Sequence, residues 1–381
     1  MNSGESIYIV DTTLRDGEQT AGVVFSVNEK TAIAGLLSEA GVDQIEVGIP
    51  AMGGDELESI KAIVDLGLKS SALAWNRAVI SDIQASLECG VDAVCISVSS
   101  SDIHIDKKLH KTRQWVLDEI ARTVNFAKSH GLYVLLSAED ASRADEGFLV
   151  EFCDAGKKAG ADRIRYCDTI GVLSPMRSME IIARLHQAIE LPLECHMHND
   201  FGMATANTIM ALRGGATFAN VTVNGLGERA GNASLEEVVM ALSYTEQRHT
   251  HIDQSKLLGL SKAVAEYSGR KLWESKPIFG SGIFTHEAGL HIMALRSDPK
   301  TYEVFSPDLV GGMRQILIGK HSNPDSLLQK YAEYRIELSE EQAREILPII
   351  RDIVVEKKRA LFDKELVEVY LKWKQSTDAA S

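Results

Sequence analysis

Short runs of apolar and β-branched residues alternate with longer amphipathic stretches between residues 7 and 244. The short runs have the length of strands, and in the longer stretches apolar residues recur at three- and four-residue spacing, as on one face of a helix. Eight strands are predicted, at residues 7–10, 44–47, 71–75, 93–98, 133–136, 163–166, 193–196 and 218–223. Helices are predicted between them, for example at residues 28–39, 114–129, 147–159 and 176–189.

Glycine residues stand where several predicted helices lead into the next strand. They are Gly41, Gly90, Gly131, Gly160 and the pair Gly214-Gly215. Glycine readily adopts the left-handed conformation that ends many helices. Eight successive strand and helix units match the size of a (β/α)8 barrel, roughly 250 residues. We therefore predict an α/β fold of the TIM-barrel type, with a doubly wound open sheet as the alternative.

The alternation stops after residue 246, and helical patterns follow at residues 255–268, 286–295, 339–360 and 363–372. An extended stretch with Pro277 and several glycines lies among them. This change predicts two parts, a barrel at residues 1–250 and a mostly helical C-terminal appendage at residues 251–381. We expect the appendage to complete the barrel mouth rather than to fold alone.

Composition narrows the class of protein. The chain is 45% hydrophobic and has a net charge of −14, without any uninterrupted apolar run of about 18 residues. We therefore expect a cytoplasmic protein that binds neither membranes nor nucleic acid, since phosphate contacts need a concentrated basic surface. Small acidic substrates remain possible because a few local cations suffice for them. The five cysteines include no CxxC pair and are interpreted as buried, reduced thiols.

Polar residues gather just after the predicted strands, at the end of a barrel where active sites form. His196 and His198 are two apart at the end of the seventh strand, so both imidazoles face the same way and can bind one metal ion. Asp16 follows the first strand as a possible third ligand, and the neighbouring Arg15 can stabilise an oxyanion. Hydrogen-bonded core histidines are the alternative interpretation of the pair.

Two further features follow strands. Glu46 and Glu139 lie at strand ends and are candidates for acid-base chemistry or for orienting other groups. The glycine-rich segment at residues 224–232 can accept an anion or bring Asn232 near the metal. Its spacing does not fit the GxGxxG pattern, so we do not predict a dinucleotide site.

Three segments in the same order, at residues 11–19, 196–202 and 224–232, resemble the signatures of the 2-isopropylmalate synthase and homocitrate synthase family. The similarity continues through residues 284–291 and 302–322. The resemblance implies condensation of acetyl-CoA with a 2-oxo acid on a barrel that holds a divalent cation, whether Mg²⁺, Mn²⁺, Zn²⁺ or Co²⁺. It implies metal ligation by Asp16, His196 and His198, with Asn232 near or in the coordination shell.

The same resemblance implies roles for other residues. Arg15 would contact the oxo group, and the pocket would be lined by Gln19, Glu46, Ser137, Glu139 and Thr169. His291 and Tyr302 match positions that reach the site from a neighbouring subunit, which implies a homodimer with shared active sites. His291 would then be the base that takes a proton from the acetyl group, and the basic segment at residues 106–113 could meet the phosphates of CoA.

Within the family, residues 73–75, 139–145 and 284–289 are similar to the homocitrate synthases that serve nitrogenase cofactor assembly. This similarity implies 2-oxoglutarate as the acceptor and homocitrate as the product. Lysine-pathway homocitrate synthases carry an arginine for the distal carboxylate where this chain has Leu135, so we expect Arg77 or Arg143 to take that part. The alternatives are 2-oxoisovalerate or pyruvate as acceptor, or a metal-dependent aldolase or lyase reaction.

Overall fold

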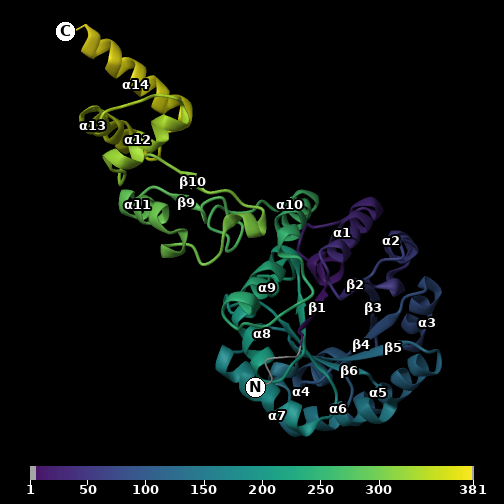
Figure 1. The fold of residues 1–381 in the computed structure, drawn as a ribbon. Helices are drawn as coiled ribbons and strands as arrows, with labels where there is room; N and C mark the ends of the chain where they lie inside the picture. The colour runs from purple at the N-terminus through teal and green to yellow at the C-terminus, as the bar shows by residue number, and fades with distance from the viewer. Residues whose placement is uncertain (1–5, 380–381) are drawn as a thin grey trace. The chain divides into compact units, whose positions relative to one another are not determined.

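Eight parallel strands close into a barrel in the computed structural model, which describes residues 6–379 (Figure 1). Each strand pairs with the next along the chain, and β8 pairs with β1. The strands are β1 Tyr8–Asp11, β2 Gln44–Gly48, β3 Ser71–Arg77, β4 Ala93–Ser99, β5 Tyr133–Glu139, β6 Arg163–Asp168, β7 Leu193–Met197 and β8 Phe218–Val221. The predicted TIM barrel is confirmed, and an open sheet is excluded.

Helices surround the barrel in Figure 1, with one main helix after each strand. They are α1 Val27–Glu39, α2 Gly54–Asp65, α3 Ile80–Cys89, α5 Arg113–Ser129, α6 Glu146–Ala159, α7 Pro175–Ala188, α8 Ala204–Arg213 and α9 Leu235–Tyr244, with a short α4 Asp102–His104 before α5. The predicted corner glycines take positive φ angles, among them Gly90 at 73° and Gly160 at 95°, except Gly214, whose φ is −72°. All five cysteines are free and buried, as expected.

The barrel interior contains both apolar and charged side chains. Val10, Leu73, Ala93, Cys95 and Leu135 form a buried cluster between the strands. Residues two apart on a strand face the same side, so the interior positions of β2, β6 and β7 also include charged side chains, which are described below.

The chain divides into two compact units between Leu272 and Trp273. The first unit includes α10 Leu257–Ser268, which packs on α1 and lies beyond the expected boundary at residue 250. The second unit contains α11 Gly289–Ser297, α12 Pro324–Glu333, α13 Glu340–Lys357 and α14 Asp363–Asp378, with strands β9 Thr285–His286 and β10 Gln315–Ile316. Its own core includes Leu327, Tyr331, Ile346, Ile350 and Leu366.

Local details differ from the sequence-based expectation. The helix predicted at residues 286–295 begins only at Gly289, because Thr285–His286 pairs in parallel with Gln315–Ile316. The eighth strand ends at Val221, and a turn at Val223–Gly225 follows in which Asn224 has a φ of 61°. Helix α12 had not been predicted. Among the described residues no helix is long and apolar enough to span a membrane.

Close packing of α7 against α8 gives a test of the fold. A Cβ on Gly214 would lie 2.6 Å from the Met179 carbonyl oxygen, so Gly214→Ala should lower the free energy of unfolding by roughly 1–3 kcal/mol. Gly35 in α1 is a matched control with nothing within 4 Å of a built Cβ, and Gly35→Ala should raise stability by roughly 0.5–1 kcal/mol. Urea denaturation measures both, and equal effects would contradict the tight contact.

Candidate active site

The carboxyl ends of the strands enclose a cavity of about 540 Å³. Most of the site residues expected from the sequence line it, namely Arg15, Asp16, Gln19, Ser137, Glu139, Thr169, His196 and His198. Glu46 and Asn232 are buried and hydrogen-bond to the residues or loops that line the cavity. A cavity of this size suits a small-molecule site.

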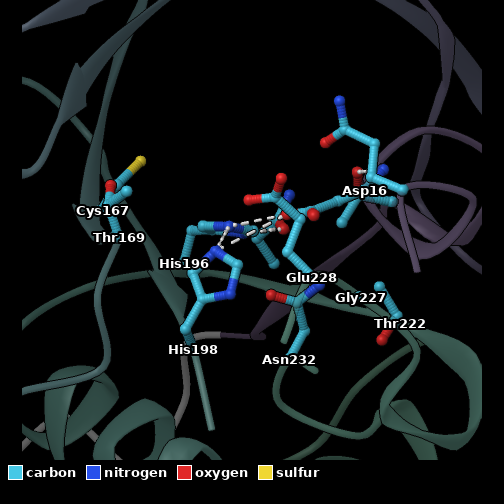
Figure 2. Close-up of polar contacts among 12 residues, drawn as sticks. Asp16, Cys167, Thr169, His196, His198, Thr222, Gly227, Glu228 and Asn232 are labelled. Carbon is cyan, nitrogen blue, oxygen red and sulfur yellow. Dashed lines mark hydrogen bonds and ion pairs between the residues drawn. The ribbon is translucent and has the colours of Figure 1, made fainter. Parts of the chain in front are cut away.

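Asp16, His196 and His198 form a buried group whose potential ligand atoms all lie within 4.8 Å of one another (Figure 2). The Asp16 Oδ2 atom is 3.0 Å from His196 Nε2 and 3.8 Å from His198 Nε2. The two histidine Nε2 atoms are 3.1 Å apart. The expected co-facial histidine pair is therefore present, and it meets the carboxylate across the mouth of the barrel.

The unpaired atoms of this group fit a divalent cation. Asp16 Oδ1 and Asn232 Oδ1 are buried without a hydrogen-bond partner, while Asn232 Nδ2 donates to the Leu226 carbonyl at 3.0 Å. Burial lowers the pKa of His198 to about 3, so its imidazole is neutral and can ligate. Burial raises the pKa of Asp16, but Arg15 and the histidines outweigh it and hold the carboxylate ionised. Two imidazoles, a carboxylate and an amide oxygen are a suitable donor set.

Asn220 holds His196 in the tautomer that metal binding needs. Its Oδ1 atom lies 2.6 Å from His196 Nδ1, so Nδ1 carries the proton and Nε2 presents its lone pair. Asn220 Nδ2 in turn donates to Glu194 Oε1 at 3.0 Å. The orientation of this ligand is therefore set from below, inside the barrel.

A series of buried ion pairs continues from Glu194. Arg165 donates from Nε to Glu194 at 2.6 Å and from Nη2 to Glu46 at 2.5 Å. Glu46 also accepts a hydrogen bond from Arg15 Nε. Burial raises the pKa of Glu46, but Arg15 and Arg165 lower it to about 2, so the carboxylate is charged. We call the series Arg15, Glu46, Arg165, Glu194 and Asn220 the buried polar chain, which links Arg15 to His196.

Glu139 reaches the cavity from the end of β5. Its carboxylate accepts a hydrogen bond from Ser99 Oγ at 2.9 Å and pairs with Lys108 from the expected basic segment. Two neighbours of Glu139 are also fixed. Thr169 Oγ1 accepts from the Asp140 backbone N–H at 2.8 Å, and Ser137 Oγ lies 3.3 Å from Cys167 Sγ.

His291 and Tyr302 belong to the second unit, where their rings pack with centroids 4.1 Å apart. His286 and Glu303 lie in the same unit, with His286 Nε2 3.8 Å from Glu303 Oε1. The unit therefore brings together the two residues expected to act as a base and its neighbour. Their part in the barrel site stays a prediction.

The two arginines expected to hold a distal carboxylate are both engaged. Arg77 lines the cavity but forms a forked pair with Asp82, with N···O distances of 2.7 and 2.9 Å. Arg143 forms a forked pair with the buried Asp140 and does not line the cavity. Arg143 is therefore not a cavity residue in this structure, because its guanidinium pairs with the buried Asp140.

Several functional candidates were missed at the sequence level. Arg165, Trp75 and Glu228 line the cavity, and the Arg15 guanidinium lies 5.8 Å from the centre of the Trp75 ring. Figure 2 shows Glu228 on the same loop as Asn232, beside the metal-ligand group. A usable signal was the charge at alternate positions of predicted strands, as in Arg163 and Arg165, which places cations inside the barrel.

Residues 6–264 match the family model described as HMGL-like, and residues 278–358 match a homocitrate synthase post-HMGL domain-like model. The chain belongs to the HMGL-like family. Within it the chain is 57% identical to 2-isopropylmalate synthase 2 of Caldanaerobacter subterraneus, over 96% of this chain and 95% of the relative. It is 46% identical to homocitrate synthase 1 of Nostoc, over 95% of this chain and 96% of the relative.

Two further proteins are similar to this member of the HMGL-like family, one in sequence and one in fold. It is 46% identical to an (R)-citramalate synthase of Methanocaldococcus jannaschii, over 91% of this chain and 70% of the relative. Among solved structures, the Bacillus subtilis HMG-CoA lyase matches with a TM-score of 0.65 at 23% identity, over 71% of this chain and 97% of that chain. The relatives support the 2-isopropylmalate, homocitrate and citramalate synthase group, and the lyase supports the fold alone.

The metal site can be tested by removing a ligand. His196→Ala should weaken Mn²⁺ binding by more than the roughly 10–100-fold typical of losing an outer hydrogen-bond partner, without unfolding the barrel. Isothermal titration with Mn²⁺ measures the affinity, and circular dichroism checks the fold. His130→Ala, at an exposed position on the end of α5, is the control. A His196→Ala variant that binds Mn²⁺ like the control would exclude this site.

Asn220 gives a separate test of ligand orientation. Asn220→Ala leaves His196 Nδ1 without its acceptor and should weaken Mn²⁺ binding by about 10–100-fold. Asn125→Ala, on the exposed face of α5, should leave the affinity unchanged. The same Mn²⁺ titration distinguishes them, and matching affinities would show that Asn220 has no part in orienting His196.

Proposed function

We propose that the chain condenses acetyl-CoA with a 2-oxo acid at the barrel mouth and hydrolyses the thioester to release CoA. The observation that carries this proposal is the buried Asp16, His196 and His198 group opening into a cavity of about 540 Å³. It lies in a chain whose relatives are named 2-isopropylmalate, homocitrate and (R)-citramalate synthases. A divalent cation bound there would supply Lewis-acid polarisation of the oxo group.

The chain's own residues would position the reactants. Arg15 is fixed by Glu46 beneath it, with its Nη1 atom 3.6 Å from Asp16, and would donate to the oxygen that gains negative charge. Ser137 and Thr169 line the cavity with hydroxyl groups that can donate to the carboxylate of the oxo acid. The pairing between Lys108 and Glu139 lies at the cavity edge, where the segment at residues 106–113 would meet the phosphates of CoA.

Proton transfer would need a base that faces the acetyl group. We propose His291, stacked on Tyr302, for this role, because imidazole is the side chain that most often acts as a general base. Glu139, held by the hydroxyl of Ser99, would orient or relay the proton. As in the sequence-based expectation, His291 and Tyr302 would come from the partner subunit of a homodimer.

Charge in the cavity favours an acceptor with an apolar side chain. Within the part of the chain that the structure describes, each cationic side chain that lines the cavity already has a carboxylate partner. These cations are Arg15, Arg77, Lys108 and Arg165. A distal carboxylate would displace one of these pairs, whereas a branched alkyl group could pack against Trp75, Val98 and Leu109. We therefore propose 2-oxoisovalerate as the acceptor, in agreement with the relative that is 57% identical.

The second candidate acceptor is 2-oxoglutarate, the acceptor expected from the sequence. It is supported by the similarity to a homocitrate synthase and by the domain model matched at residues 278–358. Arg77 is the side chain that could turn to a distal carboxylate, since it is 65% exposed in its pair with Asp82. Exposed ion pairs of this kind exchange partners at little cost.

A thiol-release assay with acetyl-CoA and a panel of 2-oxo acids tests the proposal. We expect kcat/KM for 2-oxoisovalerate to exceed that for pyruvate by about 10–200-fold, the usual range for small apolar groups in a pocket. Arg15→Lys, which loses the Nε hydrogen bond to Glu46 and with it the fixed direction of the cation, should lower turnover by about 100-fold or more. A preference for 2-oxoglutarate would select the second candidate, and absence of CoA release with every acid would exclude the condensation.

A further inference from the structure

The loop after β8 is closed so tightly that several of its positions admit only glycine. A Cβ on Gly231 would lie 2.0 Å from the Gly225 carbonyl oxygen, and a Cβ on Gly227 would lie 2.3 Å from Asn232 Nδ2. All three glycines have positive φ angles. The loop carries Glu228 and Asn232, so its conformation decides where both side chains lie relative to the metal-ligand group (Figure 2).

Arg229 lies in this loop with a φ of 55°, in the left-handed region that a long side chain rarely occupies. Such a conformation persists where the surrounding structure determines it, and it is a recurrent mark of functional sites. The contacts of the guanidinium explain why Arg229 adopts this conformation. Its Nε and Nη2 atoms donate to the two Asp200 carboxylate oxygens at 2.8 and 3.0 Å, and Nη2 also donates to the Thr169 carbonyl at 2.7 Å.

These contacts join three successive loops of the barrel mouth. Thr169 follows β6, Asp200 comes two residues after His198 on the β7 loop, and Arg229 lies on the β8 loop. The β7 and β8 loops also meet through their backbones, where the Asn199 N–H donates to the Gly231 carbonyl at 2.9 Å. A single planar guanidinium therefore spans the loops that carry His198, Asn232 and Thr169, a geometry that lysine cannot reproduce.

We propose that Arg229 is a positioning residue that locks these three loops and thereby fixes Asn232 and His198 for metal binding and Thr169 for the substrate. It acts through its partners, because its own side chain does not line the cavity. Asp200 lies close to Gly171 on the β6 loop, where a Cβ would come within 2.6 Å of Asp200 Oδ2. The β6 loop therefore leaves room for the forked pair only because position 171 has no side chain.

The matched control is Arg213 at the end of α8. It forms the same kind of forked pair with Glu246, at 2.5 and 2.9 Å, and its side chain is 44% exposed against 40% for Arg229. Arg213 belongs to no loop of the barrel mouth. Replacing either arginine removes one partly exposed forked ion pair, and replacing Arg229 also removes its longer contact of 3.5 Å with the neighbouring Glu228. Exposed contacts of that kind contribute little, so a difference between the two variants reports mainly on position.

Mn²⁺ titration of Arg229→Ala, Arg229→Lys and Arg213→Ala tests the proposal. We expect Arg229→Ala to weaken Mn²⁺ binding by about 10–100-fold, as for other groups that orient ligands, and Arg229→Lys to weaken it by less. Arg213→Ala should bind Mn²⁺ like the unchanged protein. Hydrogen exchange at residues 225–231 should be faster in Arg229→Ala alone. An Arg229→Ala affinity equal to that of Arg213→Ala would overturn the proposal.

A second variant covers the case in which Arg229→Ala fails to fold. Asp200→Asn removes the carboxylate charge and keeps the Arg229 bond to Thr169, so it should weaken Mn²⁺ binding by a smaller factor. Unchanged affinity in Asp200→Asn would then overturn the proposal.

One further readout rests on the proposed condensation: Arg229→Ala should raise KM for the oxo acid more than it lowers kcat, because Thr169 shifts. If no acceptor releases CoA but Arg229→Ala still weakens Mn²⁺ binding, the proposed condensation is excluded. The proposal that Arg229 positions the three loops is then still supported.

Discussion

The barrel mouth depends on Arg165, whose guanidinium is buried between the carboxylates of Glu46 and Glu194. Buried charges are costly unless each is paired and hydrogen-bonded, so the three side chains constrain one another. From this centre the buried polar chain extends two ways, through Glu46 to Arg15 and through Glu194 and Asn220 to His196. The cation expected to act on substrate and a metal ligand are thus oriented by the same buried pairing.

The hydrophobic pattern predicted all eight strands, and the glycines predicted where several helices end, because a two-sided buried strand and a helix C-cap are local features of sequence. The metal-ligand group was predictable for the same reason. The spacing of His196 and His198 and the place of Asp16 after a strand are both visible in the local sequence. The buried polar chain was not predictable. Which carboxylate meets Arg165 depends on strand register around a closed barrel, which no local pattern contains.

In the second unit, too, local features were predictable from the sequence and contacts between distant segments were not. Its helices α13 and α14 followed from periodicity, whereas β9 exists only because Gln315–Ile316, 30 residues further along the chain, pairs with it. Arg143 was a plausible ligand for a distal carboxylate from its position after β5. It pairs instead with Asp140, a buried residue that has a left-handed φ of 58° and does not line the cavity.

Leu135 has a consequence for how acceptor preference could change in this family. It belongs to the buried apolar cluster inside the barrel, and its register partner on β6 is Arg163, which pairs with Glu194. Arg165 in turn pairs with Glu46 and Glu194, so these buried carboxylates already have cationic partners. An arginine introduced at position 135 would add an unpaired charge, so the change would be tolerated only together with a new carboxylate or loss of one of the existing cations. Acceptor switching by this route would therefore need two coupled substitutions, and the order in which they arise would decide whether the intermediate folds.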